Sequence, residues 1–539
     1  MATAAALPAA GERPAYFTTG WTGGHNPWAI ALVVTMATFM EVLDTSIANV
    51  SLPHIAGNLS VSTDEGTWVL TSYLVSNAIV LPISGWIASK MGRKRFYMTC
   101  VAFFTLSSFL CGIAPSLPWL IFFRVLQGLG GGGLGPSEQS ILADTFPPAK
   151  RGMAFAVYGM AVVLAPAIGP TLGGFITDHY NWRWVFFINV PVGLLSLFLS
   201  NHFVTDPPHL KLMKEKSGGI DYMGLGLITL GLGTLEVVLD KGQEDDWFST
   251  PFITLFSIIA AVSLVSFIMW ELRAKSPVVD VRLFKNRNFA ASTFMMFVLG
   301  VALFGTTVLL PQFMQIMMGY TAEQAGMALS PGGLVVIMLL PFVGAMVSRF
   351  DPRYLIAFGF AMLSVSLFYM TSHLYQGIDF KTAMMLRIYQ SIGLAFLFVP
   401  INTLVYSGVP LEKNNAVSGI VNLARNLGGD FGIAFVTTLI ARRAQKHQMD
   451  LSAHTTAYNN AFESKLYGLR MAMERTGTSG VDAMHRAMAA LNGQLIQQAT
   501  TLAYIDVLKI LGVATAIMVP LLFLTEKPPK RGGPAPAAH

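Results

Sequence analysis

Two residues of opposite charge, Asp44 and Arg124, lie inside apolar stretches that are each long enough to cross a lipid bilayer. A charge at membrane depth costs at least about 2.5–3.5 kcal/mol, so it rarely occurs there without a partner or a task. At about 1.5 Å of rise per residue, Asp44 lies roughly 12 Å and Arg124 roughly 10 Å from the same membrane face. The spacing therefore predicts a buried carboxylate–arginine pair of the kind that moves protons through helix bundles. A static ion pair that fixes two helices is the alternative.

Two further carboxylates are candidates for proton binding. Glu41 precedes Asp44 by three residues and shares its helix face, so the two groups could hold one proton between them. Glu41 is therefore a candidate second proton site or a contact for cationic substrates. Glu138, roughly 10 Å from the end of its helix, is the other candidate, and a polar residue near the membrane interface is its alternative.

The composition indicates that membrane spans make up most of the chain. Hydrophobic residues make up 53% of 539 residues and charged residues only 12%, against roughly 25% charge in soluble domains. The net charge of +6 does not indicate nucleic-acid binding, because the basic residues gather at the ends of apolar segments. The polar tail 1–27 lacks the pattern of a signal peptide, so we expect the first span to remain. Cys100 and Cys111, as an isolated pair, indicate neither a disulfide nor a metal site.

Hydropathy predicts an all-α polytopic membrane protein with fourteen spans. The spans lie near 28–52, 67–89, 96–115, 117–143, 152–177, 184–204, 220–240, 251–271, 289–310, 325–347, 354–374, 382–407, 415–440 and 501–524. Basic residues concentrate in the loops on one side, whereas the short loops opposite carry only Arg183, Lys241 and Lys381. The positive-inside rule makes the basic side cytoplasmic and, with an even number of spans, places both termini there.

Two short patterns recur in the second half of the chain. Gly85-x-x-x-Ser89-Lys90 recurs as Gly344-x-x-x-Ser348-Arg349, 259 residues later, and Arg124-x-x-Gln127 recurs as Arg387-x-x-Gln390, 263 residues later. These similar offsets indicate an ancient duplication with parallel halves.

The duplication predicts two six-helix bundles that face each other across a central cavity. The expected parts are the tail 1–27, the bundles 28–204 and 289–524, two extra spans within 205–288, an external insertion at 441–500, and a disordered tail at 525–539.

Several segments resemble the major facilitator superfamily. Residues 85–95 resemble its loop signature, 124–131 its fourth-helix signature, and 43–50 the first-helix signature of the fourteen-span drug:proton antiporters. The fifth-helix antiporter signature is matched by Gly159, Pro166, Gly169, Pro170, Gly173 and Gly174. Segments 146–151, 186–191 and 239–248, together with the long loop before the last span, resemble EmrB-like multidrug export proteins.

The resemblance implies a major facilitator fold and a proton-coupled antiporter that exports small lipophilic or cationic compounds by alternating access. The proton gradient would drive it without a cofactor, from a bacterial inner membrane. It also implies two partners, a periplasmic adaptor of the EmrA type and an outer-membrane channel of the TolC type. A dedicated exporter of one metabolite or siderophore remains the alternative.

The loop signature is expected to form a gate at the cytoplasmic face. Its matched residues are Gly85, Lys90, Gly92, Arg93 and Lys94. The family usually has Asp where Ser89 stands, and the resemblance implies that this Asp pairs with basic residues across the gate. Other groups must therefore latch the gate here, or the gate is looser.

The predicted spans contain further charged residues. Arg387, Arg425 and Asp430 are assigned to a gate or an interhelical pair in preference to substrate contact. Asp506 and Lys509 lie one turn apart and are expected to neutralise each other. Glu236 and Asp240 are expected at the membrane interface, because their span lies outside both bundles.

A cavity for varied compounds should be apolar and adaptable, with few fixed donors. The candidates for its lining are Asn49, Gln127, Phe297, Gln312, Gln315 and Phe396, with Phe398 and several methionines of the ninth span. Plain packing against lipid or against other helices is the alternative for each of them.

The insertion 441–500 has apolar residues at helical spacing on both sides of a Gly-containing turn at 477–480, which predicts two amphipathic helices. It either docks the adaptor or packs on the protein itself. No catalytic residue and no metal ligand set are predicted, since no histidine lies deep in a span. A nucleotide-driven pump is unsupported, because the sequence has no G-x-x-x-x-G-K-[ST] loop. Gly128-x-Gly130-x-x-Gly133 matches a dinucleotide-binding pattern, but it lies inside a span and follows no strand, so it does not indicate nucleotide binding.

Overall fold

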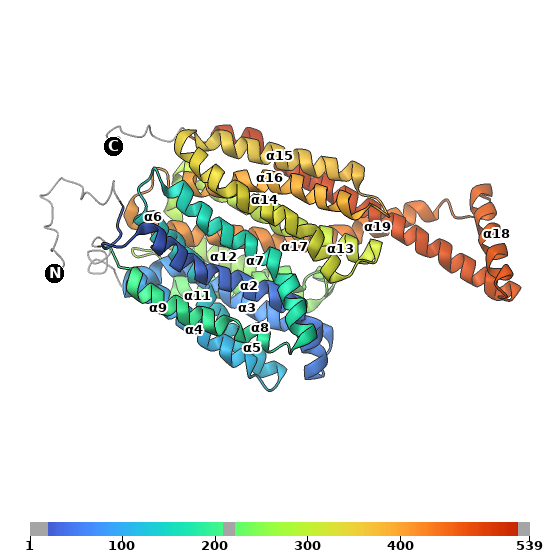
Figure 1. Cartoon of the computed structure of the whole chain (residues 1–539), viewed down its shortest axis with the longest axis horizontal. Coiled ribbons are helices and arrows are strands. Elements are labelled where there is room, and N and C mark those ends of the chain that lie inside the picture. The colour runs from blue at the N-terminus through green and yellow to red at the C-terminus, as the bar shows by residue number, and fades with distance from the viewer. Residues whose placement is uncertain (1–19, 208–220, 457, 527–539) are drawn as a thin grey trace, which may run out of the picture.

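The computed structural model describes residues 20–207, 221–456 and 458–526 (Figure 1). Most of the two predicted tails, and part of the linker after the sixth predicted span, lie outside these residues. Every regular element within the described ranges is a helix, which confirms the all-α polytopic fold predicted from hydropathy.

The helices fall into three groups along the chain. The first comprises α2 (Pro27–Leu59), α3 (Thr63–Met91), α4 (Arg93–Gly112), α5 (Leu117–Gly131), α6 (Leu134–Thr145), α7 (Arg151–His179), α8 (Trp184–Phe187) and α9 (Asn189–Phe203). The middle group comprises α11 (Tyr222–Lys241), η1 (Trp247–Ser249), α12 (Pro251–Glu271) and η2 (Val281–Lys285). The last comprises α13 (Arg287–Met318), α14 (Ala322–Arg349), α15 (Pro352–His373), α16 (Phe380–Val405), η3 (Leu411–Lys413), α17 (Asn414–Ser452), α18 (Asn460–Arg475), α19 (Gly480–Leu521) and η4 (Leu522–Leu524).

Among the described residues, eleven helices are long and apolar enough to cross a membrane, and the bent helix α7 makes a twelfth. The other two predicted spans correspond to α5 with α6 and to the first part of α17. The fourth span was expected to be continuous, but the chain breaks between α5 and α6 at Gly132 and Gly133. Consecutive glycines explain the break, because glycine weakens a helix interior.

Polar side chains cap the starts of several spans. The Asn26 side chain accepts a hydrogen bond from the Trp28 backbone at the start of α2. Ser62 and Glu65 form a capping box at α3, and Thr321 with Gln324 forms another at α14. These contacts satisfy backbone N–H groups that a helix start would otherwise leave without partners.

The two copies of the loop signature contact opposite halves of the molecule. A Cβ added to Gly85 of α3 would lie 2.7 Å from the Asn415 carbonyl oxygen of α17. A Cβ added to Gly344 of α14 would lie 2.9 Å from the Gly152 carbonyl oxygen of α7. Each glycine therefore permits a close helix approach, and α3–α17 and α7–α14 are equivalent contacts between the halves.

Helix α11 packs on the first bundle and also reaches the second. Asp240 accepts a hydrogen bond from Thr71 of α3. Glu236 is only 1% exposed, and its carboxyl group interacts electrostatically with that of Asp430 on α17. Helix α11 thus turns Glu236 toward α17 rather than outward, and its expected position at the membrane interface stays a prediction.

The insertion 441–500 forms a helical hairpin that projects from the bundles (Figure 1). Helices α17 and α19 continue beyond the bundles, and α18 lies along α19. Leu466 of α18 is buried, as are Ala483 and Ala487 of α19. The hairpin therefore covers part of its own apolar surface, while Tyr467 and Met488 remain exposed.

Candidate functional site

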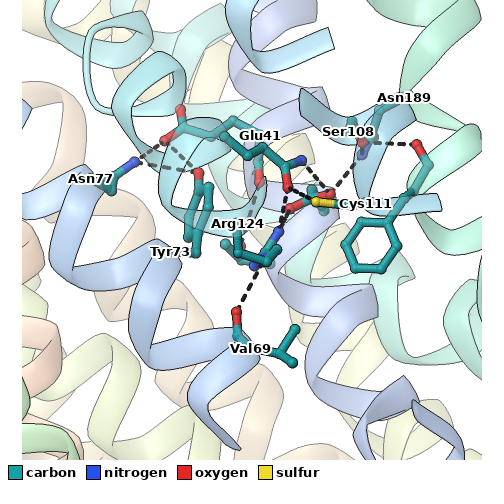
Figure 2. Close-up of polar contacts among 12 residues, drawn as sticks. Glu41, Val69, Tyr73, Asn77, Ser108, Cys111, Arg124 and Asn189 are labelled. Carbon is teal, nitrogen blue, oxygen red and sulfur yellow. Dashed lines mark hydrogen bonds and ion pairs between the residues drawn. The ribbon is translucent and has the colours of Figure 1, made fainter. Parts of the chain in front are cut away.

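Asp44 and Arg124 form an ion pair, and Figure 2 shows Arg124 within a network of buried polar side chains. Both are 0% exposed, and Arg124 Nη1 lies 2.6 Å from Asp44 Oδ2. The other carboxylate oxygen of Asp44 accepts hydrogen bonds from Gln127 at 3.0 Å and from Asn189 at 2.6 Å. Sequence analysis did not assign Asn189 to the site, although the start of α9 next to the 186–191 pattern could have drawn attention to it.

The elements around Arg124 hold its guanidinium in one orientation. Its Nε donates to the Val69 carbonyl oxygen at 3.0 Å, and Nη1 also donates to Gln127 Oε1 at 2.8 Å. The ring of Tyr73 lies 4.3 Å from the guanidinium carbon, which adds a cation–π contact. The Asp44 carboxylate of α2 is thus bound by side chains of α5 and α9.

Glu41 does not join this network and points toward α3 instead (Figure 2). Its Oε1 accepts from Asn77 at 2.9 Å and from Tyr73 at 3.3 Å. The charge of Arg425 also interacts with Glu41. Tyr73 contacts both Glu41 and the guanidinium of Arg124, so one side chain links the two carboxylate sites.

Glu138 is completely buried within the protein. Its Oε2 accepts a hydrogen bond from Thr38 of α2, while Oε1 has no partner. A buried carboxyl oxygen without a partner is costly, so Glu138 is chemically suited to hold a proton.

The gate residues are held by groups other than Ser89, whose hydroxyl donates to the Trp86 carbonyl of its own helix. Arg93 pairs with Asp144 at 2.5 Å, and Asn414 of α17 donates to the other oxygen of Asp144 at 2.8 Å. This contact joins α4 and α6 to the second bundle at the expected cytoplasmic face.

The remaining gate residues position the chain between α3 and α4. Gly92 adopts a φ of 95°, which favours glycine, and Lys90 lies over the Trp86 ring. The Lys94 backbone N–H donates to Asp206 at 2.8 Å.

The antiporter signature lies along α7. This helix bends by 40° between Pro166 and Ile168, where proline removes a backbone hydrogen bond. Gly169 and Gly173 approach Ser46 and Ile47 of α2 so closely that an added Cβ would overlap Ser46 and press on Ile47. Gly159 lies against the Phe398 ring, whereas an added Cβ at Gly174 would meet nothing. Pro170 belongs to the same helix.

A cavity of about 110 Å³ lies between α7, α13, α14 and α16. Its wall is apolar except for Thr307, Arg387 and Ser391. The apolar lining consists of Val162, Val163, Pro166, Leu299, Leu303, Phe304, Leu329, Gly333, Val336, Leu340, Leu394 and Phe398. Arg387 was assigned to a gate or an interhelical pair, and the structure places it in the cavity wall.

The six residues proposed for a substrate cavity do not line this one, and their role stays a prediction. Gln127 is bound to Asp44, the Phe297 ring lies tilted against that of Phe431, and the Phe396 ring meets that of Phe358 edge to face. Gln312 is half-buried, and Asn49 and Gln315 are exposed. Side-chain type alone did not reveal which face of each helix borders the cavity.

The other charged residues of the spans have these partners. Asp430 interacts with Glu236 of α11, which is an interhelical contact of the predicted kind. Asp506 lies 4.0 Å from Lys509 but only 2.9 Å from His447 of α17, so a residue of the neighbouring helix is its closest partner. Arg425 donates to the adjacent Asn426, and its Nη1 has no hydrogen-bond partner.

Known proteins resemble this chain over most of its length. The model of the Major Facilitator Superfamily matches residues 34–433. The multidrug export protein EmrB of Escherichia coli (strain K12) is 38% identical over 449 residues, which cover 83% of this chain and 87% of EmrB. The probable multidrug resistance protein EmrY of the same strain is 35% identical, covering 94% of this chain and 96% of EmrY.

A solved structure supports the fold. The proton:xylose symporter XylE superimposes with a TM-score of 0.58 at 14% identity, covering 92% of this chain and 95% of that chain. This similarity concerns the fold alone. Together with the family match and the relatives, it identifies the chain as a multi-pass membrane transporter, not an enzyme, that belongs to the Major Facilitator Superfamily.

Proposed function

We propose that this transporter is a proton-coupled antiporter that exports lipophilic toxic compounds by alternating access. The similarity to a multidrug export protein supports drug-like substrates. The observation that carries proton coupling is Asp44, a carboxylate at membrane depth whose counter-charge, Arg124, is also fully buried. Such a pair is expensive to keep in a membrane, and proton transfer is a task that requires it.

In this mechanism, protonation of Asp44 removes the negative charge that holds Arg124, Gln127 and Asn189 together. Helices α2, α5 and α9 then lose their shared contact and can shift relative to one another. Tyr73 transmits the change to Glu41, because it contacts both Arg124 and the Glu41 carboxyl group.

The contact between the halves supplies the second element of alternating access. Asp144 binds Arg93 within the first bundle and Asn414 of the second bundle. The Ser140 and Ser418 hydroxyl groups add a contact of 2.6 Å nearby. These bonds close the expected cytoplasmic face, and they must break before that face opens.

We further propose that the protein is the inner-membrane component of a tripartite system, with both termini in the cytoplasm. The basic loops on one side support this orientation. The hairpin of α17, α18 and α19 extends on the opposite side and keeps apolar groups exposed, which supports docking of an EmrA-type adaptor that leads to a TolC-type channel.

Vesicles reconstituted with the full-length protein test the coupling. With a proton gradient and a pH-sensitive dye, a lipophilic cation should trigger proton movement in the wild type and none in Asp44→Asn. Asp64→Asn, which neutralises an exposed carboxylate on α3, is the matched control and should behave like the wild type. Wild-type proton movement in Asp44→Asn would contradict proton coupling through Asp44.

A further inference from the structure

We infer that Arg387 is an anion-binding group in the central cavity, and that the transporter takes up amphipathic anions with an acidic head and an apolar tail. The inference rests on the proposed function, because it assigns a substrate class to the same transport cavity. It follows from a difference between the two halves of the molecule.

The first half contains a complete set of charges around its arginine. Arg124 donates to Gln127, three residues later, at 2.8 Å and to Asp44 at 2.6 Å. The carboxylate therefore neutralises the guanidinium within the protein, and no outside anion is needed.

The second half repeats this arrangement without the acid. Arg387 and Gln390 follow Arg124 and Gln127 by 263 residues, and Thr307 follows Asp44 by the same 263 residues. Arg387 donates to Gln390 at 2.8 Å and to Thr307 at 3.2 Å. The geometry around the guanidinium is thus retained, while a hydroxyl group stands where the first half has a carboxylate.

Arg387 is consequently a buried cation without an internal counter-ion. Its side chain is 9% exposed, and its Nε has no hydrogen-bond partner. Among the residues that the structure describes, no acidic group lies within ion-pair distance or acts electrostatically on it. An unpaired charge at this depth is costly, and an anion that enters the cavity would remove that cost.

The surrounding cavity determines the rest of the ligand. Thr307 and Ser391 are the polar neighbours of Arg387 in the wall, and leucines, valines and aromatic rings such as Phe398 form the remainder. A single cation within an apolar wall suits a molecule with one negative group and a hydrocarbon tail. Arginine also binds a carboxylate through two parallel hydrogen bonds, which favours carboxylates over diffuse anions.

Binding of two probes with the same tail tests this assignment in the full-length protein, reconstituted in nanodiscs of zwitterionic lipid. Radiolabelled laurate carries the anionic head, and radiolabelled dodecyltrimethylammonium carries a cationic one. Thr307→Asp restores the missing acid and should weaken laurate binding by at least about 30-fold, because it occupies Arg387 from within. Thr307→Asn is its neutral match and should leave laurate binding near the wild-type value.

Arg387→Gln should cause a similar loss of laurate binding and leave the cationic probe bound. An equal loss of both probes would mean that Arg387 only holds α13 and α16 together, which overturns the inference. Undiminished laurate binding in Thr307→Asp would overturn it as well, and this test does not depend on Arg387→Gln folding correctly.

An anionic phospholipid headgroup offers the same chemistry as laurate. Nanodiscs that contain phosphatidylglycerol distinguish the two sources. A lipid headgroup that occupies the site should weaken laurate binding by the wild type, whereas a site for free carboxylates should bind laurate equally with and without this lipid. Binding of the cation but not of laurate by the wild type would overturn this inference and leave the proposed function intact. Loss of proton movement from the wild type itself would instead contradict the proposed function.

Discussion

Neutralising Asp44 and Arg124 together should disturb the protein less than neutralising either one alone. Asp44→Asn leaves a guanidinium at 0% exposure without its counter-charge, and Arg124→Gln leaves a carboxylate in the same position. Removing one partner of a buried ion pair costs about 3–5 kcal/mol, whereas replacing both by neutral groups is often close to neutral.

The surrounding contacts decide where each variant falls in this range. Asn at position 44 can still accept the hydrogen bonds that Gln127 and Asn189 donate, so Asp44→Asn should cost about 3 kcal/mol. Arg124→Ala should cost more, because it also removes the bond to the Val69 carbonyl and the contact with the Tyr73 ring. The double variant Asp44→Asn/Arg124→Gln should lose about 3 kcal/mol less free energy of unfolding than the losses of its two single variants added together.

Unfolding of the purified protein in mixed detergent micelles measures these free energies as a double-mutant cycle. Additive losses in the double variant would refute the ion pair as the dominant contact of the network. Transport adds a second criterion, since the double variant should be folded and uncoupled. If it moved protons at the wild-type rate, the pair would be a static connection between α2 and α5.

Three further predictions concern other parts of the molecule. Asn414→Ala removes a charge-assisted hydrogen bond to Asp144, worth about 1.5–3 kcal/mol, and should let the cytoplasmic face open more often. A cysteine in place of Ser84 should then react faster with a maleimide added from the cytoplasmic side. An unchanged rate would show that the bond between Asn414 and Asp144 does not hold this face closed. Glu41→Gln should weaken export of cations more than of neutral compounds, and equal losses in resistance profiles would contradict its exposure to substrate. Replacing 452–499 with a Gly/Ser linker should spare transport in vesicles and abolish resistance in double-membraned cells. Loss of transport in vesicles would show that the hairpin supports the transport fold itself.

The contact between Asp44 and Arg124 was accessible from sequence because depth along a membrane helix increases linearly with residue number. Both residues lie a fixed number of turns from a span end, so their depths could be compared without a structure. Asn189 could not be found in this way. Its place depends on the short break between α8 and α9, which turns the start of α9 toward Asp44.

The packing of α11 also could not be predicted from the sequence. Hydropathy placed the helix in the membrane, but the side on which it packs depends on contacts with α3 and α17. Glu236 is therefore buried beside Asp430, although its position near a helix end suggested exposure. Of the residues suggested for a cavity lining, Phe398 does line the cavity beside Arg387, and the other lining residues could not be selected because apolar residues occur on all faces of these spans.

The repeat explains more than the duplication of the fold. Both halves keep an arginine and a glutamine at the same depth, but only the first half keeps the acid, so one copy is suited to bind a proton and the other a substrate anion. Helix α7 lies between them. Its Gly173 packs on Ile47, three residues after Asp44, and its Pro166 lines the cavity of Arg387. The glycine leaves no space between α7 and α2, so in the proposed mechanism we expect a shift of α2 on protonation to displace α7 and thereby the cavity wall. The proposal therefore couples proton binding and substrate binding through one helix, without any direct contact between Asp44 and the substrate.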